Sequence, residues 1–226
     1  MSVKDGFIIA CAWPETLCKQ AGSWYDTLMN DLGFSRNGYY KVGHAALILI
    51  NNESGSCEYF YFGRYHAPNG FGRVRNAQHD HELRMHTVAQ IENGDITNVP
   101  EILSELFQNE SGHGTGELYG SHTAIHYQKA KNKLNEMIAE EFISYGPFIQ
   151  SGTNCSRFVN KVLRAGRPKL DEHVLLKFPF TVSPTPMWNL RALQNEIVCV
   201  GNPELVQETN SVYVTEYATR SSSSSR

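Results

Sequence analysis

No long hydrophobic run occurs in this chain, and nothing at its start has the pattern of an export signal. The apolar stretch from Phe7 to Trp13 is far shorter than the roughly 18 residues that a membrane-spanning helix needs. It is also too short for the apolar region of a signal peptide, and Asp5 interrupts the approach to it. We therefore expect a protein with no membrane span that is located in the cytoplasm.

An excess of basic residues is also absent. The chain has 20 Lys and Arg against 23 Asp and Glu, for a formal net charge of −3, whereas a nucleic-acid-binding protein should present a basic face. Apolar residues make up 41% and charged residues 19% of the chain, a balance typical of a globular protein rather than a disordered one. The expected partner is a small-molecule, peptide or acyl substrate and not a nucleic acid; the oligomeric state stays open.

Closely spaced cysteine pairs are missing as well. The five cysteines, an odd number, are Cys11, Cys18, Cys57, Cys155 and Cys199. This pattern fits reduced thiols better than a disulfide framework, and it has neither metal nor redox spacing. The sequence therefore predicts no cofactor and no bound metal.

The hydrophobic pattern predicts one α+β domain over residues 1–220, followed by a disordered Ser-rich tail at 221–226. Strand patterns lie at 7–13, 42–50, 57–65, near 73, and at 82–91, 118–125, 197–200 and 212–217. Helix patterns lie at 16–32, from 98, and at 127–145, 153–165 and 188–193. Turn residues at 51–56 make the second and third strands a hairpin.

The segment around Cys155 carries the strongest chemical signal. Thr153 or Asn154 can cap a helix, which places Cys155 in its first turn, ahead of an apolar stripe that starts at Phe158. Because the positive end of a helix dipole favours a thiolate, this position predicts a lowered thiol pKa and a nucleophile. The alternative is an inert buried cysteine, which is common in protein cores.

His44 is the matching candidate, because it is a titratable ring in the otherwise apolar strand 42–50. A buried imidazole needs a polar partner. A cysteine at a helix start and a histidine on a core strand are the two parts of a thiolate–imidazolium pair, in which the histidine serves as general base and then acid.

Gly43-His44-Ala45 on a strand, followed far downstream by Thr153-Asn154-Cys155-Ser156-Arg157-Phe158-Val159, resembles the permuted branch of the NlpC/P60 papain-like superfamily. That branch includes the YiiX-type proteins and the lecithin:retinol acyltransferase group. The resemblance implies a circularly permuted papain-like core, with an antiparallel sheet packed against the cysteine helix. It also implies a cysteine hydrolase (amidase or peptidase) or acyltransferase, with Cys155 as nucleophile and His44 as base.

The resemblance further implies a third polar residue that orients the histidine, on the strand after it. That strand, 58–66, has no Asp, Asn or Gln. Counting from the turn puts residues 62–64 opposite His44, and the candidates for the third residue are Glu58, Tyr61 and His66. Further residues expected to line a cleft are Trp13, Asn154, Arg64 and His113.

Two other interpretations remain open. A non-catalytic ligand- or protein-binding module on the same fold is favoured by the missing third residue. A metal-dependent hydrolase would use His79, His81 and a carboxylate, but His79 and His81 point away from His86 on an extended chain, and no motif of known ligand spacing occurs.

Overall fold

A computed structural model of the chain describes residues 3–20, 26–31, 35–112, 114–181 and 183–201. Its main feature within these residues is a seven-stranded sheet in the order β11-β7-β6-β5-β1-β10-β12, in which every neighbouring pair is antiparallel. The strands are β1 Gly6–Trp13, β5 His44–Asn51, β6 Cys57–Gly63, β7 Phe71–Arg75, β10 Leu118–Ile125, β11 Ile143–Ser144 and β12 Val198–Val200.

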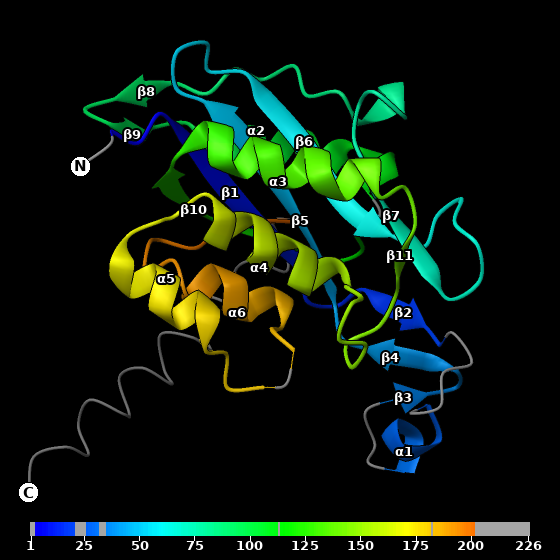
Figure 1. The fold of residues 1–226 in the computed structure, drawn as a ribbon. Helices are drawn as coiled ribbons and strands as arrows, with labels where there is room; N and C mark the ends of the chain where they lie inside the picture. The colour runs from blue at the N-terminus through cyan, green and yellow to red at the C-terminus, as the bar shows by residue number, and fades with distance from the viewer. Residues whose placement is uncertain (1–2, 21–25, 32–34, 113, 182, 202–226) are drawn as a thin grey trace, which may run out of the picture.

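Smaller sheets and helices surround this sheet. The short strands are β2 Leu17–Lys19, β3 Ser35–Arg36 and β4 Tyr39–Lys41 in one sheet, and β8 Ile91–Glu92 and β9 Asp95–Ile96 in another. The helices are α1 Asp26–Asp31, α2 Val99–Gln108, α3 Tyr127–Ala139, α4 Cys155–Ala165, α5 Leu170–Lys177 and α6 Pro186–Arg191, with 3₁₀ turns η1 His81–Leu83 and η2 Glu110–Gly112. The α3–α6 group covers one face of the sheet and α2 the other (Figure 1).

The two faces of the sheet have separate cores because side chains alternate along a strand. On β5, Ala45 and Leu47 belong to the core under α4, whereas Ala46 and Ile48 belong to the core on the α2 side. The same alternation determines on which face of the sheet the side chain of the first residue of β5 lies.

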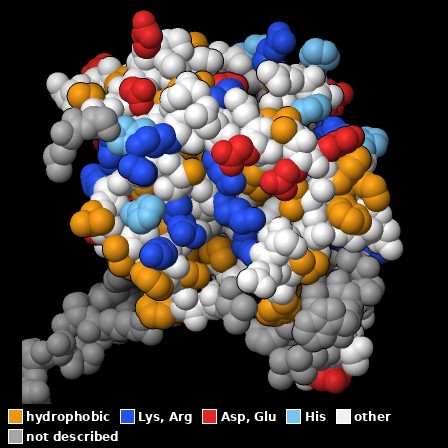
Figure 2. All heavy atoms as spheres, viewed as in Figure 1, with side chains coloured by type: hydrophobic (Ala, Val, Ile, Leu, Met, Phe, Trp, Pro, Cys, Tyr) orange, Lys and Arg blue, Asp and Glu red, His pale blue; other side chains and the backbone are white. Residues whose placement is uncertain are grey.

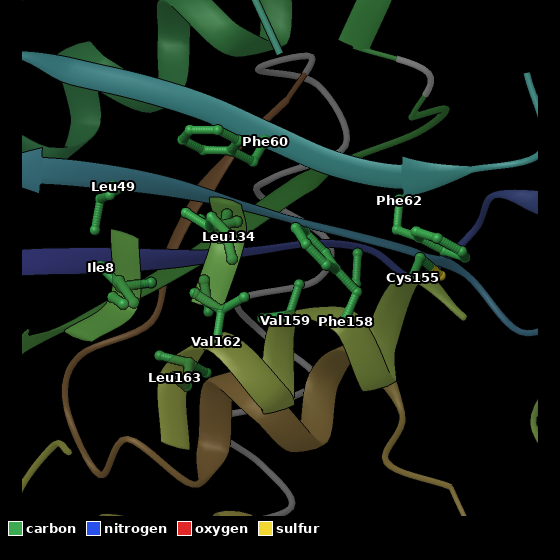
Figure 3. Close-up of a cluster of buried hydrophobic side chains, with 14 of the residues drawn as sticks. Ile8, Leu49, Phe60, Phe62, Leu134, Cys155, Phe158, Val159, Val162 and Leu163 are labelled. Atoms are coloured by element: carbon green, nitrogen blue, oxygen red, sulfur yellow. The ribbon is translucent and has the colours of Figure 1, made fainter. Parts of the chain in front are cut away.

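Helix α4 packs against the sheet through apolar side chains that recur every three or four residues. Phe158, Val159, Val162 and Leu163 are 0% exposed and point toward the sheet side chains (Figure 3). Burying each such side chain contributes about 1.5–3 kcal/mol. The stripe therefore fixes the register of the helix, and with it the place of its first residue.

Several sequence predictions are confirmed. Strands lie where they were expected at 7–13, 118–125 and 198–200, and the hairpin of β5 and β6 continues into β7. The helices from Val99, Tyr127 and Cys155 and the short helix near Trp188 are also present. The strand expected at 212–217 and the Ser-rich tail lie outside the described residues.

The helix predicted at 16–32 is wrong at its start. Leu17–Lys19 forms β2, which pairs with β4 through Leu17 and Lys41. Pairing with a neighbouring strand outweighs the weak helix pattern here, as tertiary context often does.

The strand predicted at 82–91 is also wrong. The backbone N–H groups of His86 and Thr87 donate to the carboxylate of Glu105 at 2.6 and 2.7 Å, so these donors are satisfied by a side chain of α2 instead of a strand. Residues 81–83 form η1, and only Ile91 at the end of the range enters a strand. His79, His81 and His86 therefore do not lie on one extended strand, and the opposite orientation expected for His86 does not follow.

Helix α3 is shorter than the helix predicted at 127–145, and helix α5 was not predicted. Helix α3 ends at Ala139, before Glu141 with φ of 57°, and Ile143–Ser144 pairs with β7. Helix α5 lies in a segment for which the sequence predicted neither a helix nor a strand. None of the helices in the described ranges is long and apolar enough to cross a membrane.

Candidate active site

A cavity of about 480 Å³ opens beside the start of α4. Its wall combines the small β2–β4 sheet, the residues before β5, and two further segments, at 145–148 and at 180–181 with 183–186. Its apolar and aromatic side chains include Tyr40, Val42, Tyr145, Pro147, Phe148, Phe180, Pro184 and Pro186. Lys19 and Arg64 bring positive charge to this wall, so the cavity suits an apolar group attached to a polar or anionic one.

Cys155 lines this cavity from the first position of α4. Asn154 caps the helix, its Oδ1 accepting a hydrogen bond from the Arg157 N–H at 2.8 Å, while Thr153 is fully buried and bridges to Tyr145. The cysteine is 5% exposed and lies close to Phe62 (Figure 3). The helix start therefore presents the sulfur at the junction of the core and the cavity.

The backbone of β5 reaches the sulfur. Pairing between β5 and β6 ends at Ala46 and Tyr61, and the next amide along β5, that of Ala45, donates a hydrogen bond to the Cys155 sulfur. Burial raises the pKa of the thiol, and the hydrogen bonds from Ala45 and Ser156 oppose that rise only in part. The expectation of a lowered pKa is therefore wrong for this arrangement, because burial outweighs the favourable position at the helix start.

His44 is the first residue of β5 and follows Gly43, whose φ of +72° is a left-handed conformation. The imidazole is 8% exposed. Its ring centroid lies 5.7 Å from that of Trp13 and 5.8 Å from that of Tyr61, both in the core on the α2 side. Thus the structure places His44 next to the amide that contacts Cys155, with its ring packed against the other face of the sheet.

Of the candidates for a third residue, Tyr61 is the one that packs against the His44 ring, at 76° between ring planes. Its hydroxyl accepts a hydrogen bond from Arg75, a buried residue that also pairs with Asp80. Burial raises the pKa of Tyr61 to about 12, so the phenol is neutral at physiological pH.

The other two candidates for the third residue lie elsewhere. Glu58 accepts hydrogen bonds from Tyr127 at 2.8 Å and from Lys131, near the far end of β6, where it lies opposite Leu49. His66 is exposed beside Tyr65. Both therefore contact residues other than His44.

The residues expected in a cleft divide into three groups. Asn154 and Arg64 line the cavity. Trp13 is 3% exposed and belongs to the core on the α2 side. His113 lies outside the described residues.

Arg157 organises one wall of the cavity, which the sequence reasoning did not anticipate. Its guanidinium donates to the carbonyl oxygens of Gly146, Pro147 and Ile149 at 3.1, 3.3 and 2.8 Å. The adjoining Phe148 lines the cavity. The sequence does contain a feature that could have predicted this contact: an arginine in the first turn of the cysteine helix, after a loop with glycine and proline.

Cys18 is a second thiol in the cavity wall. Its sulfur donates to the Gly43 carbonyl at 3.4 Å, and burial, followed by the nearby Cys155, raises its pKa to about 12. The sequence reasoning missed this residue because it assigned the segment to a helix.

Comparison with known proteins supplies the family. The model of the type VI secretion system effector TseH-like family matches residues 8–170. The chain belongs to this family of type VI secretion system effectors. A solved crystal structure of the effector TseH covers 88% of this chain and 94% of its own, with 21% sequence identity and a TM-score of 0.57. This structural similarity shows the fold of the chain. In a search of curated proteins, none matches the chain.

Proposed function

We propose that this TseH-like protein is a cysteine hydrolase or acyltransferase with a circularly permuted NlpC/P60 core. The observation that carries the proposal is the position of Cys155. Its sulfur lies at the start of a helix, accepts a hydrogen bond from the Ala45 amide and lines a cavity large enough for a substrate. The order of the His strand before the Cys helix, β5 before α4, is the order that permutation gives.

In the proposed reaction, His44 takes the thiol proton and the Cys155 sulfur attacks an amide or ester carbonyl carbon. A tetrahedral intermediate forms and collapses to a thioester as the bond to the leaving nitrogen or oxygen breaks, and the imidazolium returns its proton to that leaving group. Water, or an acceptor alcohol or amine, then releases the acyl group. The backbone N–H of Cys155 at the helix start supports the developing oxyanion.

This mechanism requires the His44 ring to come within about 3 Å of the sulfur when substrate binds. Catalytic hydrogen bonds often tighten only in the substrate complex. His44 is the end residue of its strand, next to Gly43, so the movement can be local. Tyr61, held by Arg75, contacts the ring in its position before this movement.

The walls of the cavity favour a substrate with an apolar portion. Phe148, Phe180 and Tyr145 are part of the lining, and Arg64 supplies a cation that stacks 5.3 Å from the Tyr145 ring centroid. An acyl chain or a peptide with apolar side chains fits this environment. The family membership supports an effector role, and a hydrolytic reaction is one way such an effector would act.

The test is acyl-enzyme formation on p-nitrophenyl esters of two, four and eight carbons. We expect release of p-nitrophenolate, an added acyl mass on the peptide that contains Cys155, and a preference for the longer chains. Cys155→Ser should lose both signals, while Cys57→Ser, at a thiol outside the cavity wall, should keep them. Unchanged turnover in Cys155→Ser would overturn the proposal.

A non-catalytic binding module is the second candidate. The raised pKa of Cys155 and the contacts of the His44 ring with Trp13 and Tyr61 favour it. It predicts that apolar ligands bind equally well to the wild type and to Cys155→Ser, with no acyl mass on any cysteine.

A further inference from the structure

Helix α5 exposes apolar side chains where a surface helix normally presents polar ones. Leu170, Val174 and Phe178 are spaced four residues apart and therefore share one side of the helix, with exposed fractions of 80%, 47% and 65%. Phe180, just beyond, is 92% exposed. The opposite side of α5 buries Glu172 and Leu176. These four exposed apolar residues are here called the α5 ridge.

Positive charge surrounds the α5 ridge, although the whole chain is acidic. Residues 161–177 contain five Lys or Arg and two acidic residues. One of the acidic residues, Glu172, is buried and accepts a hydrogen bond from Thr123 at 2.6 Å, which leaves Asp171 as the exposed one. Figure 2 shows Lys and Arg side chains gathered over α4 and α5 beside hydrophobic ones.

The neighbours of His173 confirm that these cations lie together. Its pKa is lowered by burial and then by the positive charges of Arg164, Lys177 and Arg167. Lys177 also lies over the Phe178 ring, at 5.4 Å from its centroid. The ridge and the basic cluster thus form one mixed surface.

The α5 ridge adjoins the candidate active site. Phe180 lines the cavity that contains Cys155. A flat partner that covers the ridge would therefore also lie against the mouth of the cavity.

We propose that this surface binds an anionic lipid bilayer, with the apolar ridge inserted among the lipids and the cations against the headgroups. Exposed apolar side chains gain free energy by inserting among lipids, and each cation near an anionic surface adds to the attraction. The cations favour an anionic partner. The apolar ridge favours a partner with an apolar interior, and a nucleic acid has no such interior. This inference does not depend on the proposed reaction.

The experiment uses the full chain as Cys155→Ala, so that turnover plays no part. Flotation is measured with vesicles of phosphatidylcholine that contain 30% phosphatidylglycerol, and with vesicles of phosphatidylcholine alone. Two double variants test the surface: Leu170→Ser with Phe178→Ser, and Arg167→Glu with Lys177→Glu. The matched controls are Phe107→Ser and Arg84→Glu, exposed residues on α2 and after η1.

We expect binding to the anionic vesicles, weaker binding at high salt, and a loss of at least about tenfold in each double variant. The two controls should bind as Cys155→Ala does. Equal binding to both kinds of vesicle, or double variants that bind like the controls, would overturn the proposal. So would tighter binding to a DNA duplex than to the anionic vesicles, or self-association that the ridge variants abolish. Since Cys155 is already replaced, failure here is distinct from failure of the proposed reaction.

Discussion

The backbone amide of Ala45 donates a hydrogen bond to the sulfur of Cys155. This contact joins the start of α4 to the start of β5, although the two residues are far apart in the sequence. The donor, Ala45, is the residue that follows His44 in the sequence. The same N–H group stabilises a thiolate at Cys155.

Removing the imidazole should change the pH profile of Cys155. Under the proposed reaction, in which the His44 ring reaches the sulfur, alkylation of the wild type by iodoacetamide should persist below pH 7, because an imidazolium stabilises the thiolate. In His44→Ala the reaction should move above the range of a free thiol, since burial raises the pKa of Cys155. Peptide mass spectrometry resolves the thiols. Cys57, whose pKa is raised to about 11, serves as the internal control, and identical Cys155 profiles in the two proteins would contradict the pairing.

Replacing the helix cap should loosen the start of α4. Asn154→Ala removes the acceptor for the Arg157 N–H and should lower the free energy of unfolding by about 1 kcal/mol, measured by urea denaturation. Thr185→Ala removes the equivalent cap of α6 and should cost a similar amount. Asn154→Ala should alter the alkylation rate of Cys155 more than Thr185→Ala does, because Thr185 lines the cavity but does not cap the helix that carries the cysteine, and an equal change in both variants would argue against a local effect.

Arg157→Ala should release the cavity wall at 146–150. The guanidinium donates to three backbone carbonyls there, and charge-assisted hydrogen bonds of this kind contribute about 1.5–3 kcal/mol each when buried. Because this side chain is partly exposed, we expect a total loss of about 2 kcal/mol, together with faster amide hydrogen exchange in the loop. Arg191→Ala, at an exposed position on α6, should change neither quantity.

Gly43→Ala should be more damaging than Gly38→Ala. Both glycines have positive φ, +72° and +79°, so each substitution carries the cost of a left-handed alanine, about 1–2 kcal/mol. A Cβ at Gly43 would lie 2.8 Å from the Trp13 carbonyl oxygen, whereas at Gly38 it meets nothing within 4 Å. Equal losses in urea denaturation would show that the close approach at Gly43 is readily relieved.

Stability should fall at alkaline pH. Burial raises the pKa of Cys18 to about 12, of Cys57 to about 11 and of Tyr61 to about 12, while the unfolded groups ionise at about 8.5 for thiols and about 10 for Tyr. Above about pH 8.5 the unfolded state therefore binds fewer protons than the native state, and the free energy of unfolding decreases as pH rises. Urea midpoints at pH 8 and pH 10 measure this, and Cys57→Ala should flatten the dependence. A midpoint that does not change would contradict the assignment.

Much of the sheet could be predicted because its strands carry strong local patterns. The continuous apolar run of β1 reflects burial on both faces, and the turn after β5 fixed the hairpin. The pairing of β5 with β6 ends at Ala46 and Tyr61; counting two residues further in the same register gives Gly63 for His44, within the window that counting from the turn had predicted.

The rest depended on contacts that a local pattern does not contain. Glu105 satisfies the backbone of 86–87 from a distant helix, and β2 exists because β4 returns beside it. Helix α5 was missed because its apolar residues lie on both its buried and its exposed sides, as Leu176 and Val174 do. The cavity wall is formed by segments that are far apart in the sequence, and no local sequence pattern indicates that they lie together.

The chain order of the sheet has a consequence for synthesis. Residues 6–75 hold β1, β5, β6 and β7, which are neighbours in the sheet, so the strand with His44 can be built from early, local hairpins. Strand β10 must close a loop of more than a hundred residues to reach β1, and α4 follows it. A chain that stops before residue 155 therefore has the strand that carries His44 but not the helix that carries Cys155, so the cavity beside Cys155 can form only after α4 has been made.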